Sequence, residues 1–428
     1  MDETKESPSL LEEEGDEVPP EMTAEEVVAM GRHPVFTTQQ TFEDLKLPPS
    51  ILNAVHHIGF KHPTPIQSKV IPLALEGRDL IGLAQTGSGK TAAFVIPMAE
   101  RLEHHEGISK SPLGLILCPT REIALQTKAF LDLFGKHHDL NTACIIGGVK
   151  MNPQIRDLER GPDIVVATPG RLVDHMERRT ISLSKVRELV LDEADHMLDM
   201  GFLPQIMRIL EAVPRQRRTM MFSATMPPPI ERLAQRYLID PIRIDILPEG
   251  RAATGITHRI YLVKAEHKRE CLLGLVHQEL GSTLIFTRTK LDADWLCGVL
   301  DREGHPVSKI HSDRSQSERT QALQGFREGQ HRILVATGIA SRGLDVPAIE
   351  HVINFEIPDT VEEYIHRAGR TARAGAVGIV STIAVWQDKP MIKEVEAALG
   401  KELPRCTVPG VPPYVELKVK KPFGRRRR

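Results

Sequence analysis

Two series of short apolar runs, separated by longer segments of helical character, constrain the fold of this chain more than any other feature. The first series is "DLIGLA", "LGLILCP", "TACIIGG", "DIVVATP", "ELVLDEAD" and "TMMFSAT". The second is "THRIYLV", "STLIFT", "RILVAT", "HVINFE" and "GIVSTIA". Strands that are apolar along their whole length are typical of parallel sheets covered by helices on both faces. The sequence therefore predicts an α/β protein with two parallel sheets.

The segment "ILPEGRAATG" lies between the two series, and its Pro, Gly and small residues are typical of a linker. Upstream of the first series the chain begins with an acidic stretch that is poor in aromatic residues, which predicts disorder. The chain ends in the basic tail "KVKKPFGRRRR". We therefore expect an N-terminal extension, a first domain, the linker, a second domain and a C-terminal extension at residues 1–35, 40–245, 246–255, 256–400 and 401–428.

Composition excludes several classes of protein. The net charge of −2 excludes a uniformly basic protein. No apolar run approaches the roughly 20 residues that cross a bilayer, and the acidic N-terminus has no apolar core of the kind found in signal peptides. The five cysteines include no C-x-x-C pair. That pattern argues against a zinc site or a disulfide framework and favours a reducing compartment, so we expect a cytoplasmic protein without membrane contact.

The stretch "AQTGSGKT" (84–91) lies between the apolar run "DLIGL" and the helix-like segment "KTAAFVIPMAERL". Loop N–H groups followed by a helix N-terminus favour an anion at this point. Gly87 and Gly89 would let the backbone approach phosphates, Lys90 would neutralise the β- and γ-phosphates, and Thr91 would hold Mg²⁺. The alternative is a chance turn rich in Gly and Ser. The ATP-binding loop that we expect comprises Ala84, Gln85, Thr86, Gly87, Ser88, Gly89, Lys90 and Thr91.

The run "ELVLDEAD" supplies carboxylates at the end of another expected strand. A magnesium–triphosphate site needs such a group, and Asp192 is placed to hold the metal, through water. Glu193 is the candidate to take the proton from an attacking water. The alternative is an acidic strand-end loop at the surface.

Seven motifs occur in a characteristic order: "AQTGSGKT", "PTREIA", "TPGR", "DEAD", "SAT", "TGIASRGLD" and "HRAGRTARAG". Together they resemble the DEAD-box family of ATP-dependent RNA helicases, over roughly residues 40 to 400. The resemblance implies two tandem RecA-like domains, an ATP-binding one and a helicase C-terminal one. It also implies an RNA-stimulated ATPase that uses ATP and Mg²⁺ and yields ADP and phosphate.

The segment "GFKHPTPIQ" (59–67), within 40–68, resembles the part of the family that recognises adenine. A Gln side chain both donates and accepts hydrogen bonds, so one amide reads two ring positions. The resemblance assigns Gln67 to the base edge and Phe60 to stacking on the adenine. The alternative for Phe60 is ordinary core packing. Phe42 resembles the isolated upstream aromatic residue that supports this segment.

The motif "HRAGRTARAG" carries Arg370 and Arg373, which the resemblance assigns as arginine fingers on the γ-phosphate. An arginine finger contributes roughly 10³–10⁵ in rate. Because both residues belong to the second domain, the ATP site would be complete only when the domains close. The alternative is a solvated helix face. Asp345 is assigned to the ribose.

The resemblance also gives residues that contact RNA and residues that couple the two sites. Hydroxyls, backbone N–H groups and guanidinium groups suit phosphate contacts, which position a strand without reading its sequence. For each threonine, a turn or helix-cap role is an equal alternative. The RNA-contacting candidates are Thr120, Arg121, Gly148, Thr168, Arg171, Thr287, Arg288 and Thr337, and the coupling candidates are Asp195, Ser223 and Thr225.

These assignments predict a helicase that binds the RNA backbone without sequence preference. ATP-driven closure would unwind short duplexes or remodel RNA–protein complexes. An RNA clamp and a DNA-directed translocase are the alternatives. We expect a monomeric core, with protein partners docking on the terminal extensions. Gly338 stands where the family often carries Asp, which removes a side-chain contact and leaves the strength of interdomain coupling open.

Overall fold

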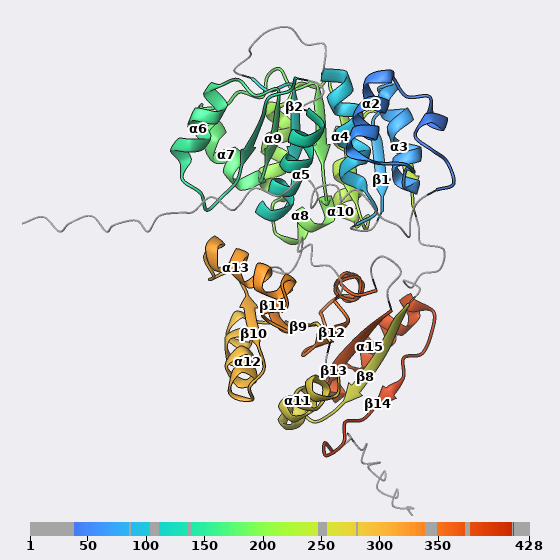
Figure 1. Cartoon of the computed structure of the whole chain (residues 1–428), viewed down its shortest axis with the longest axis vertical. Helices are drawn as coiled ribbons and strands as arrows, with labels where there is room; N and C mark the ends of the chain where they lie inside the picture. The colour runs from blue at the N-terminus through green and yellow to red at the C-terminus, as the bar shows by residue number, and fades with distance from the viewer. Residues whose placement is uncertain are drawn as a thin grey trace, which may run out of the picture.

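The computed structural model of the protein describes residues 38–84, 87–102, 111–135, 139–246, 255–279, 281–338, 349–372, 377–412 and 414. The two terminal extensions therefore fall largely outside the described residues, as does most of the linker. The described chain forms two α/β domains, drawn one above the other in Figure 1.

The first domain contains a seven-stranded sheet in the order β3-β4-β2-β5-β6-β1-β7, and all its pairings are parallel. Its strands are β1 (Leu80–Leu83), β2 (Gly114–Leu117), β3 (Thr142–Ile145), β4 (Ile164–Ala167), β5 (Glu188–Leu191), β6 (Arg218–Ser223) and β7 (Ile242–Asp245). The residues of β1, β2, β4 and β5 are all buried. Complete burial explains why these strands are apolar throughout instead of alternating.

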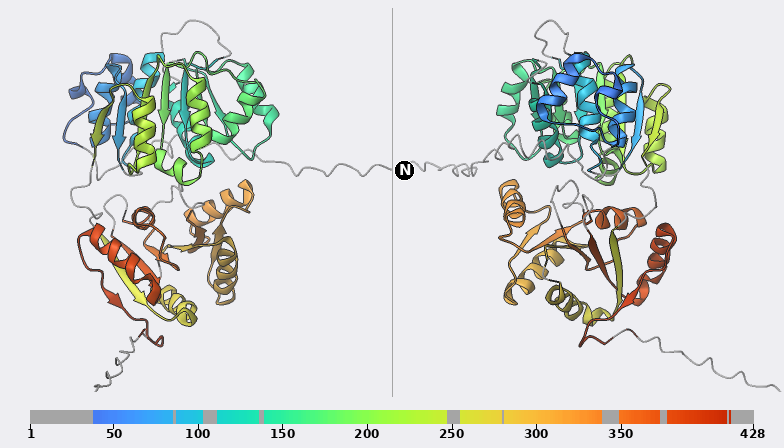
Figure 2. Two further views of the ribbon diagram at one scale, coloured as in Figure 1. Left: turned by 180° about the vertical axis from the view of Figure 1, so that it is seen from behind. Right: turned by 45° about the vertical axis from the view of Figure 1, so that its right-hand side comes forward.

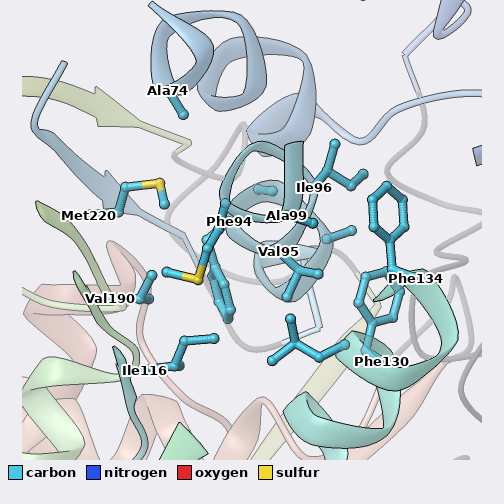
Figure 3. Packing of buried hydrophobic residues seen from close by; sticks show 14 of the residues in the cluster. Ala74, Phe94, Val95, Ile96, Ala99, Ile116, Phe130, Phe134, Val190 and Met220 are labelled. Carbon is cyan, nitrogen blue, oxygen red and sulfur yellow. The ribbon is translucent and has the colours of Figure 1, made fainter. Parts of the chain in front are cut away.

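Helices cover both faces of this sheet (Figures 1 and 2). They are η1 (Glu43–Leu45), α2 (Pro49–Ile58), α3 (Pro65–Leu75), α4 (Lys90–Leu102), α5 (Arg121–Gly135), α6 (Met151–Glu159), α7 (Pro169–Glu177), α8 (Ala194–Asp199), α9 (Leu203–Ala212) and α10 (Pro228–Tyr237). Two separate apolar clusters result, one on each face of the sheet. In the first, Phe94 and Val95 of α4 lie among Ile116, Val190 and Met220 of the sheet (Figure 3).

The second domain repeats this arrangement. Its sheet has the order β10-β11-β9-β12-β13-β8-β14, again with parallel pairings. The strands are β8 (Ile256–Leu262), β9 (Thr283–Thr287), β10 (Val307–Ile310), β11 (Ile333–Thr337), β12 (His351–Asn354), β13 (Gly378–Ala384) and β14 (Arg405–Cys406). Numbered from the first strand of each sheet, both orders are 3-4-2-5-6-1-7. The prediction of two parallel sheets covered by helices is confirmed.

The helices of the second domain are η2 (Ala265–His267), α11 (Lys268–Gln278), α12 (Lys290–Arg302), α13 (Gln316–Arg327), α14 (Val361–Ala368), η4 (Trp386–Asp388) and α15 (Lys389–Leu399). The sheet also reaches past residue 400, where we placed the end of this domain, because β14 pairs with β8. Leu403 and Val408 on either side of β14 are buried in the two apolar clusters of this domain. The chain between residues 401 and 412 is therefore packed against the second domain.

Parallel strands bring the residues that follow them to one edge of a sheet. In the first domain, the loop at residue 84 follows β1, Asp192 follows β5 and Ser223 ends β6. In the second, Arg288 follows β9 and Thr337 ends β11. The motif residues of each domain are thereby collected at one edge of its sheet.

Candidate functional site

The loop between β1 and α4 is shaped by glycine and by a buried lysine. Gly89 has φ of +88°, and a Cβ at this position would lie 2.6 Å from the side-chain nitrogen of Gln67. Both the backbone conformation and the close approach therefore require glycine. The buried Lys90 begins α4, and its Nζ donates to the carbonyl oxygen of Ala84 at 3.1 Å. The ammonium is thereby folded back over the loop.

Ser88 in the same loop has a buried hydroxyl oxygen without a hydrogen-bond partner among the described residues. A buried polar group without a partner costs free energy. A phosphate oxygen seated on the loop would accept a bond from this hydroxyl, so the loop is suited to hold phosphate. Gln85 and Thr86 lie outside the described residues, and Thr91 is half-buried in the first turn of α4.

Gln67 connects the segment upstream of β1 to this loop. Its Oε1 accepts from the backbone N–H of Thr64 at 2.9 Å, and its Nε2 donates to the carbonyl oxygen of Gly89 at 3.1 Å. Thr64 and Gln67 form a capping box at the start of α3, which fixes the glutamine side chain. The predicted contact of Gln67 with adenine is untested, and the structure gives this residue a bond to the loop that we did not predict.

Phe60 lies in the core of the first domain. Its ring stacks between Phe42 and Phe130, at centroid distances of 6.4 and 6.2 Å. Only 5% of Phe60 is exposed. This packing favours the core alternative for Phe60, whereas stacking on adenine remains a prediction.

Asp192 and Glu193 leave β5 at the carboxyl edge of the first sheet, and both are buried. Glu193 has φ of 49° and ψ of 56°, the left-handed conformation that non-glycine residues rarely adopt. Such residues cluster at functional sites, where the surrounding structure holds them. The carboxylate of Glu193 contacts Nδ1 of His196 at 3.0 Å.

Burial raises the pKa of Asp192 to about 7, against the lowering effect of the Lys90 ammonium and with a further rise from the Glu193 carboxylate. Burial also acts to raise the pKa of Glu193. The bond to His196 and the charges of Lys90, His196 and Arg370 outweigh burial and hold this pKa below its usual value. The pKa values of the two adjacent carboxyl groups are thus shifted in opposite directions, upward for Asp192 and downward for Glu193.

Arg370 is a described residue of the second domain whose charge affects the pKa of Glu193. It lies just after α14 and is 7% exposed. Its charge is among those that lower the pKa of a carboxyl group in the first domain, so the two domains bring these residues into electrostatic range. Arg373 and Asp345 fall outside the described residues.

Asp195 joins α8 to the segment after β6. Its Oδ2 accepts from the backbone N–H groups of Ala224 and Thr225, at 3.1 and 2.8 Å, and from the Thr225 hydroxyl at 2.8 Å. Its own N–H donates to Ser223 Oγ at 3.2 Å. Asp195, Ser223 and Thr225 are the three residues that the sequence singled out for coupling, and the structure brings them together.

A pocket of about 800 Å³ lies between the two domains. Six of the eight residues predicted to contact RNA line it, namely Thr120, Arg121, Thr168, Arg171, Arg288 and Thr337. Gly148 is next to the lining residue Gly147, and Thr287 is fully buried. The pocket therefore brings predicted RNA-contacting residues of both domains to one surface.

Comparisons with known proteins identify the family. Residues 64–233 match the family model described as DEAD/DEAH box helicase, and residues 267–375 match the helicase conserved C-terminal domain. The "ATP-dependent rRNA helicase RRP3" of Candida albicans is 43% identical over 368 residues, which cover 86% of this chain and 68% of that protein. This chain belongs to the DEAD-box helicase family.

Two further similarities accompany that result. The "DEAD-box ATP-dependent RNA helicase CshA" of Bacillus cereus is 40% identical over 370 residues, covering 86% of this chain and 70% of the relative. The solved structure of S. cerevisiae Dbp5 bound to RNA and ADP BeF3 is 30% identical and superposes with a TM-score of 0.75, covering 86% of this chain and 95% of that one. The two sheets of this helicase are tandem RecA-like domains.

Three arginines that line the pocket of this DEAD-box protein are held in place by neighbouring groups. Arg121 packs on Gly148, whose φ of +71° and missing side chain leave room for the guanidinium group. Arg171 donates to the carbonyl oxygen of Val149 at 2.7 Å, and Arg288 contacts Asp359 at 3.0 Å. Fixed guanidinium groups suit backbone phosphates, because little side-chain entropy is lost on binding.

The threonines divide between the two roles that we considered. Thr120 caps α5, since its hydroxyl accepts from the N–H of Ile123 at 3.3 Å. The buried Thr287 hydroxyl donates to the carbonyl oxygen of Thr289 at 3.2 Å, which is a turn role. Thr168 precedes α7 without a side-chain capping bond. Thr168 and Thr337 are thus the stronger of the threonine candidates for RNA contact.

Sequence reasoning missed two further contacts of this helicase, beside the bond from Gln67 to the loop. The first is an ion pair between Arg319 of α13 and Glu122 of α5, 3.2 Å apart, which joins the two domains beside the pocket. The second is the bond between His196 and Glu193. Glu122 lies within the motif "PTREIA" and His196 directly follows "DEAD", so their positions were a usable signal for them. Nothing in the sequence marks Arg319.

The described part of the chain contains neither a cluster of metal-binding side chains nor a helix that could span a membrane. Across those residues no group of three or more His, Cys, Asp or Glu side chains could hold a metal ion. No helix within the described ranges is long and apolar enough to cross a membrane.

Proposed function

We propose that this helicase couples ATP hydrolysis to RNA binding through closure of its two domains, and so unwinds short RNA duplexes or remodels RNA–protein complexes. The observation that carries the proposal is electrostatic: the charge of Arg370, a buried residue of the second domain, helps to lower the pKa of Glu193 in the first. The RNA candidates of both domains line one pocket beside it. One movement of the domains would therefore affect both sites.

In the proposed reaction, the loop at 84–91 holds the phosphates of ATP and Lys90 neutralises them. Glu193 takes a proton from the attacking water. Because the bond to His196 lowers its pKa, Glu193 is a weak base in the described arrangement, and its basicity rises when that bond is exchanged for water. Arg370 and Arg373 stabilise the charge that develops on the γ-phosphate. Phe60, Gln67 and Asp345 are proposed to hold the adenosine moiety.

We propose Mg²⁺ as the cofactor, held by Asp192 and Thr91. The donor set fits this ion, because Mg²⁺ is commonly bound by one or two carboxylates together with substrate phosphates and water. When bound, the ion would neutralise negative charge on the phosphates of ATP. The pKa of about 7 for Asp192 describes the protein without that charge.

For RNA, we propose that arginines and backbone N–H groups of the pocket contact phosphates. Such contacts carry no sequence information, and contacts to 2′-hydroxyls would distinguish RNA from DNA. The bonds of Asp195 to Ser223 and Thr225 link the strand that carries Glu193 to the segment after β6. We propose this network as the connection between RNA binding and hydrolysis.

The direct test is the ATPase rate with and without RNA, measured beside the unwinding of a short RNA duplex. We expect RNA to stimulate the ATPase more than DNA of matched sequence, and the duplex to separate only with ATP. Stimulation without strand separation would favour an RNA clamp. Equal stimulation by DNA would favour a DNA-directed translocase.

Replacing Glu193 with glutamine is expected to slow hydrolysis by roughly 10²–10⁴ and to leave nucleotide binding intact. The amide keeps the shape of the side chain but cannot accept the proton. Because the closed RNA complex would persist, its lifetime in the presence of ATP should increase. ATPase assays and RNA dissociation kinetics measure the two effects.

A matched control for this change is Glu211→Gln on α9, an exposed position with a distant ion-pair partner at 3.8 Å. It should behave as the unmodified protein. Unchanged hydrolysis and unchanged RNA lifetime in Glu193→Gln would remove this residue from the mechanism.

We further propose a monomeric core that works in the cytoplasm. All five cysteines are free, and Cys118 and Cys271 are buried, which suits a reducing compartment. Sedimentation of the purified protein tests the first statement, and cell fractionation tests the second. Protein partners are proposed to dock on the terminal extensions, which fall largely outside the described residues.

A further inference from the structure

Gly338 follows β11 at the edge of the interdomain pocket. A Cβ at this position would overlap the carboxylate of Glu363 and would lie 3.4 Å from a terminal nitrogen of Arg367. The backbone of Gly338 is not in the left-handed region. The glycine is therefore needed here for space, and Glu363 is the side chain that uses the space.

Glu363 binds Arg367 one turn along α14. A single carboxylate oxygen, Oε1, accepts from Nη2 of Arg367 at 2.6 Å and from Nε at 3.1 Å. The Arg367 side chain is 7% exposed and that of Glu363 is 19% exposed. Water is therefore largely excluded from this ion pair. The Glu363 carboxylate balances the positive charge of the buried Arg367 guanidinium group.

Arg367 in turn fixes α14 to the second sheet. Its Nη1 donates to Asn354 Oδ1 at 3.2 Å and to the carbonyl oxygen of Glu356 at 3.3 Å. Its guanidinium carbon lies 4.9 Å from the centroid of the Phe286 ring. Arg370 follows in the next turn, and its N–H donates to the carbonyl oxygen of Arg367 at 3.1 Å. The position of Arg370 thus depends on how firmly Arg367 is held.

We propose that Glu363 is a positioning residue that occupies the space left by Gly338 and holds Arg367, so that α14 presents Arg370 toward the ATP site. This inference rests on the proposed role of Arg370 in hydrolysis. Glu363, Gly338 and Arg367 all line the pocket proposed for RNA. The same ion pair therefore stands between the RNA surface and the arginine that serves hydrolysis.

We expect that Arg367 can be held by a carboxylate on either of two residues, Glu363 or an aspartate in place of Gly338. Glu363→Ala leaves Arg367 without this partner. Gly338→Asp places a second carboxylate against Glu363, and like charges at contact distance repel. In the double variant Gly338→Asp with Glu363→Ala, the new carboxylate lies where it can reach Arg367. Gly338→Asn with Glu363→Ala has the same shape but no charge.

The experiment measures kcat and KM for ATP at saturating RNA in the full chain. We expect Glu363→Ala and Gly338→Asp each to lower kcat by roughly 10- to 100-fold, the cost of a misplaced catalytic group, with a smaller effect on KM. The aspartate double variant should recover most of that loss, and the asparagine one should not. The exposed Glu394 of α15 provides a control, since Glu394→Ala should match the unmodified protein.

Three results would overturn the proposal. The first is an unchanged kcat in Glu363→Ala, and the second is a kcat of Gly338→Asp with Glu363→Ala that is no higher than that of either single variant. The third is an equal recovery of kcat in Gly338→Asn with Glu363→Ala. Failure of the proposed function is distinguishable, because the unmodified protein would then show no RNA-stimulated ATPase. In that event thermal unfolding decides the ion-pair claim. Each single change should lower the melting temperature, and only the aspartate double variant should restore it.

Discussion

Replacing Lys90 with alanine is expected to abolish ATP hydrolysis and to weaken ATP binding. The ammonium is buried and held 3.1 Å from the carbonyl oxygen of Ala84, so the loop carries a cation in a fixed place. Its charge also lowers the pKa values of Asp192 and Glu193. Alanine would therefore remove the cation proposed to neutralise the phosphates, together with one of the charges that lower the pKa values of the two carboxyl groups.

Steady-state ATPase assays and titration with a fluorescent nucleotide measure the two effects of Lys90→Ala. Lys185 is an exposed lysine of the same domain, and Lys185→Ala is the matched control that should keep full activity. Turnover of Lys90→Ala close to that of the control would show that the loop does not hold phosphates in the proposed way.

Replacing Arg370 with alanine is expected to lower the RNA-stimulated ATPase rate by roughly 10³ or more, since arginine fingers contribute about 10³–10⁵ in rate. ATP binding should change little, because the phosphate loop belongs to the other domain. The prediction depends on the electrostatic effect of Arg370 on Glu193, which shows that the second domain supplies positive charge near this carboxylate. Single-turnover hydrolysis at saturating RNA separates the chemical step from binding.

A suitable control for the second experiment is Arg302→Ala at the exposed end of α12, where the side chain bonds only to the nearby carbonyl oxygen of Gly298 in the described contacts. It removes one positive charge from the same domain. A rate for Arg370→Ala within a few-fold of this control would mean that the second domain does not complete the ATP site.

Much of the fold could be predicted from the sequence, because burial on both faces makes central strands apolar throughout. The runs around β1, β2, β4 and β5 are of this kind, and each was recognised. The order of strands within a sheet could not be predicted in this way, since apolar runs do not specify their neighbours. The edge strands β7, β10 and β14 were missed because "IRID", "VSKI" and "RC" are not apolar throughout.

The candidate site, like the fold, could be predicted from the sequence only in part. Residues that follow strands are carried to one edge of a parallel sheet, so Asp192, Ser223 and Thr337 could be located from their motifs. Contacts between distant elements could not. The pairing of Arg319 with Glu122 depends on how two domains face each other, and the left-handed backbone of Glu193 has no signature in the residue type.

The shared strand order of the two sheets has a consequence for how functions are distributed between the two domains. In both orders the sixth position is taken by the first strand of the sheet, β1 in one domain and β8 in the other. From β1 the chain enters a glycine-rich loop that is suited to phosphate. From β8 it passes through Val263 and Lys264 into the short helix η2, and the stretch "VKAEHK" that includes this helix contains no glycine. The scaffold is thus used twice while the phosphate-binding turn is used once. The first domain carries the loop suited to bind the phosphates of ATP, and the second carries Arg370, the arginine proposed to assist hydrolysis.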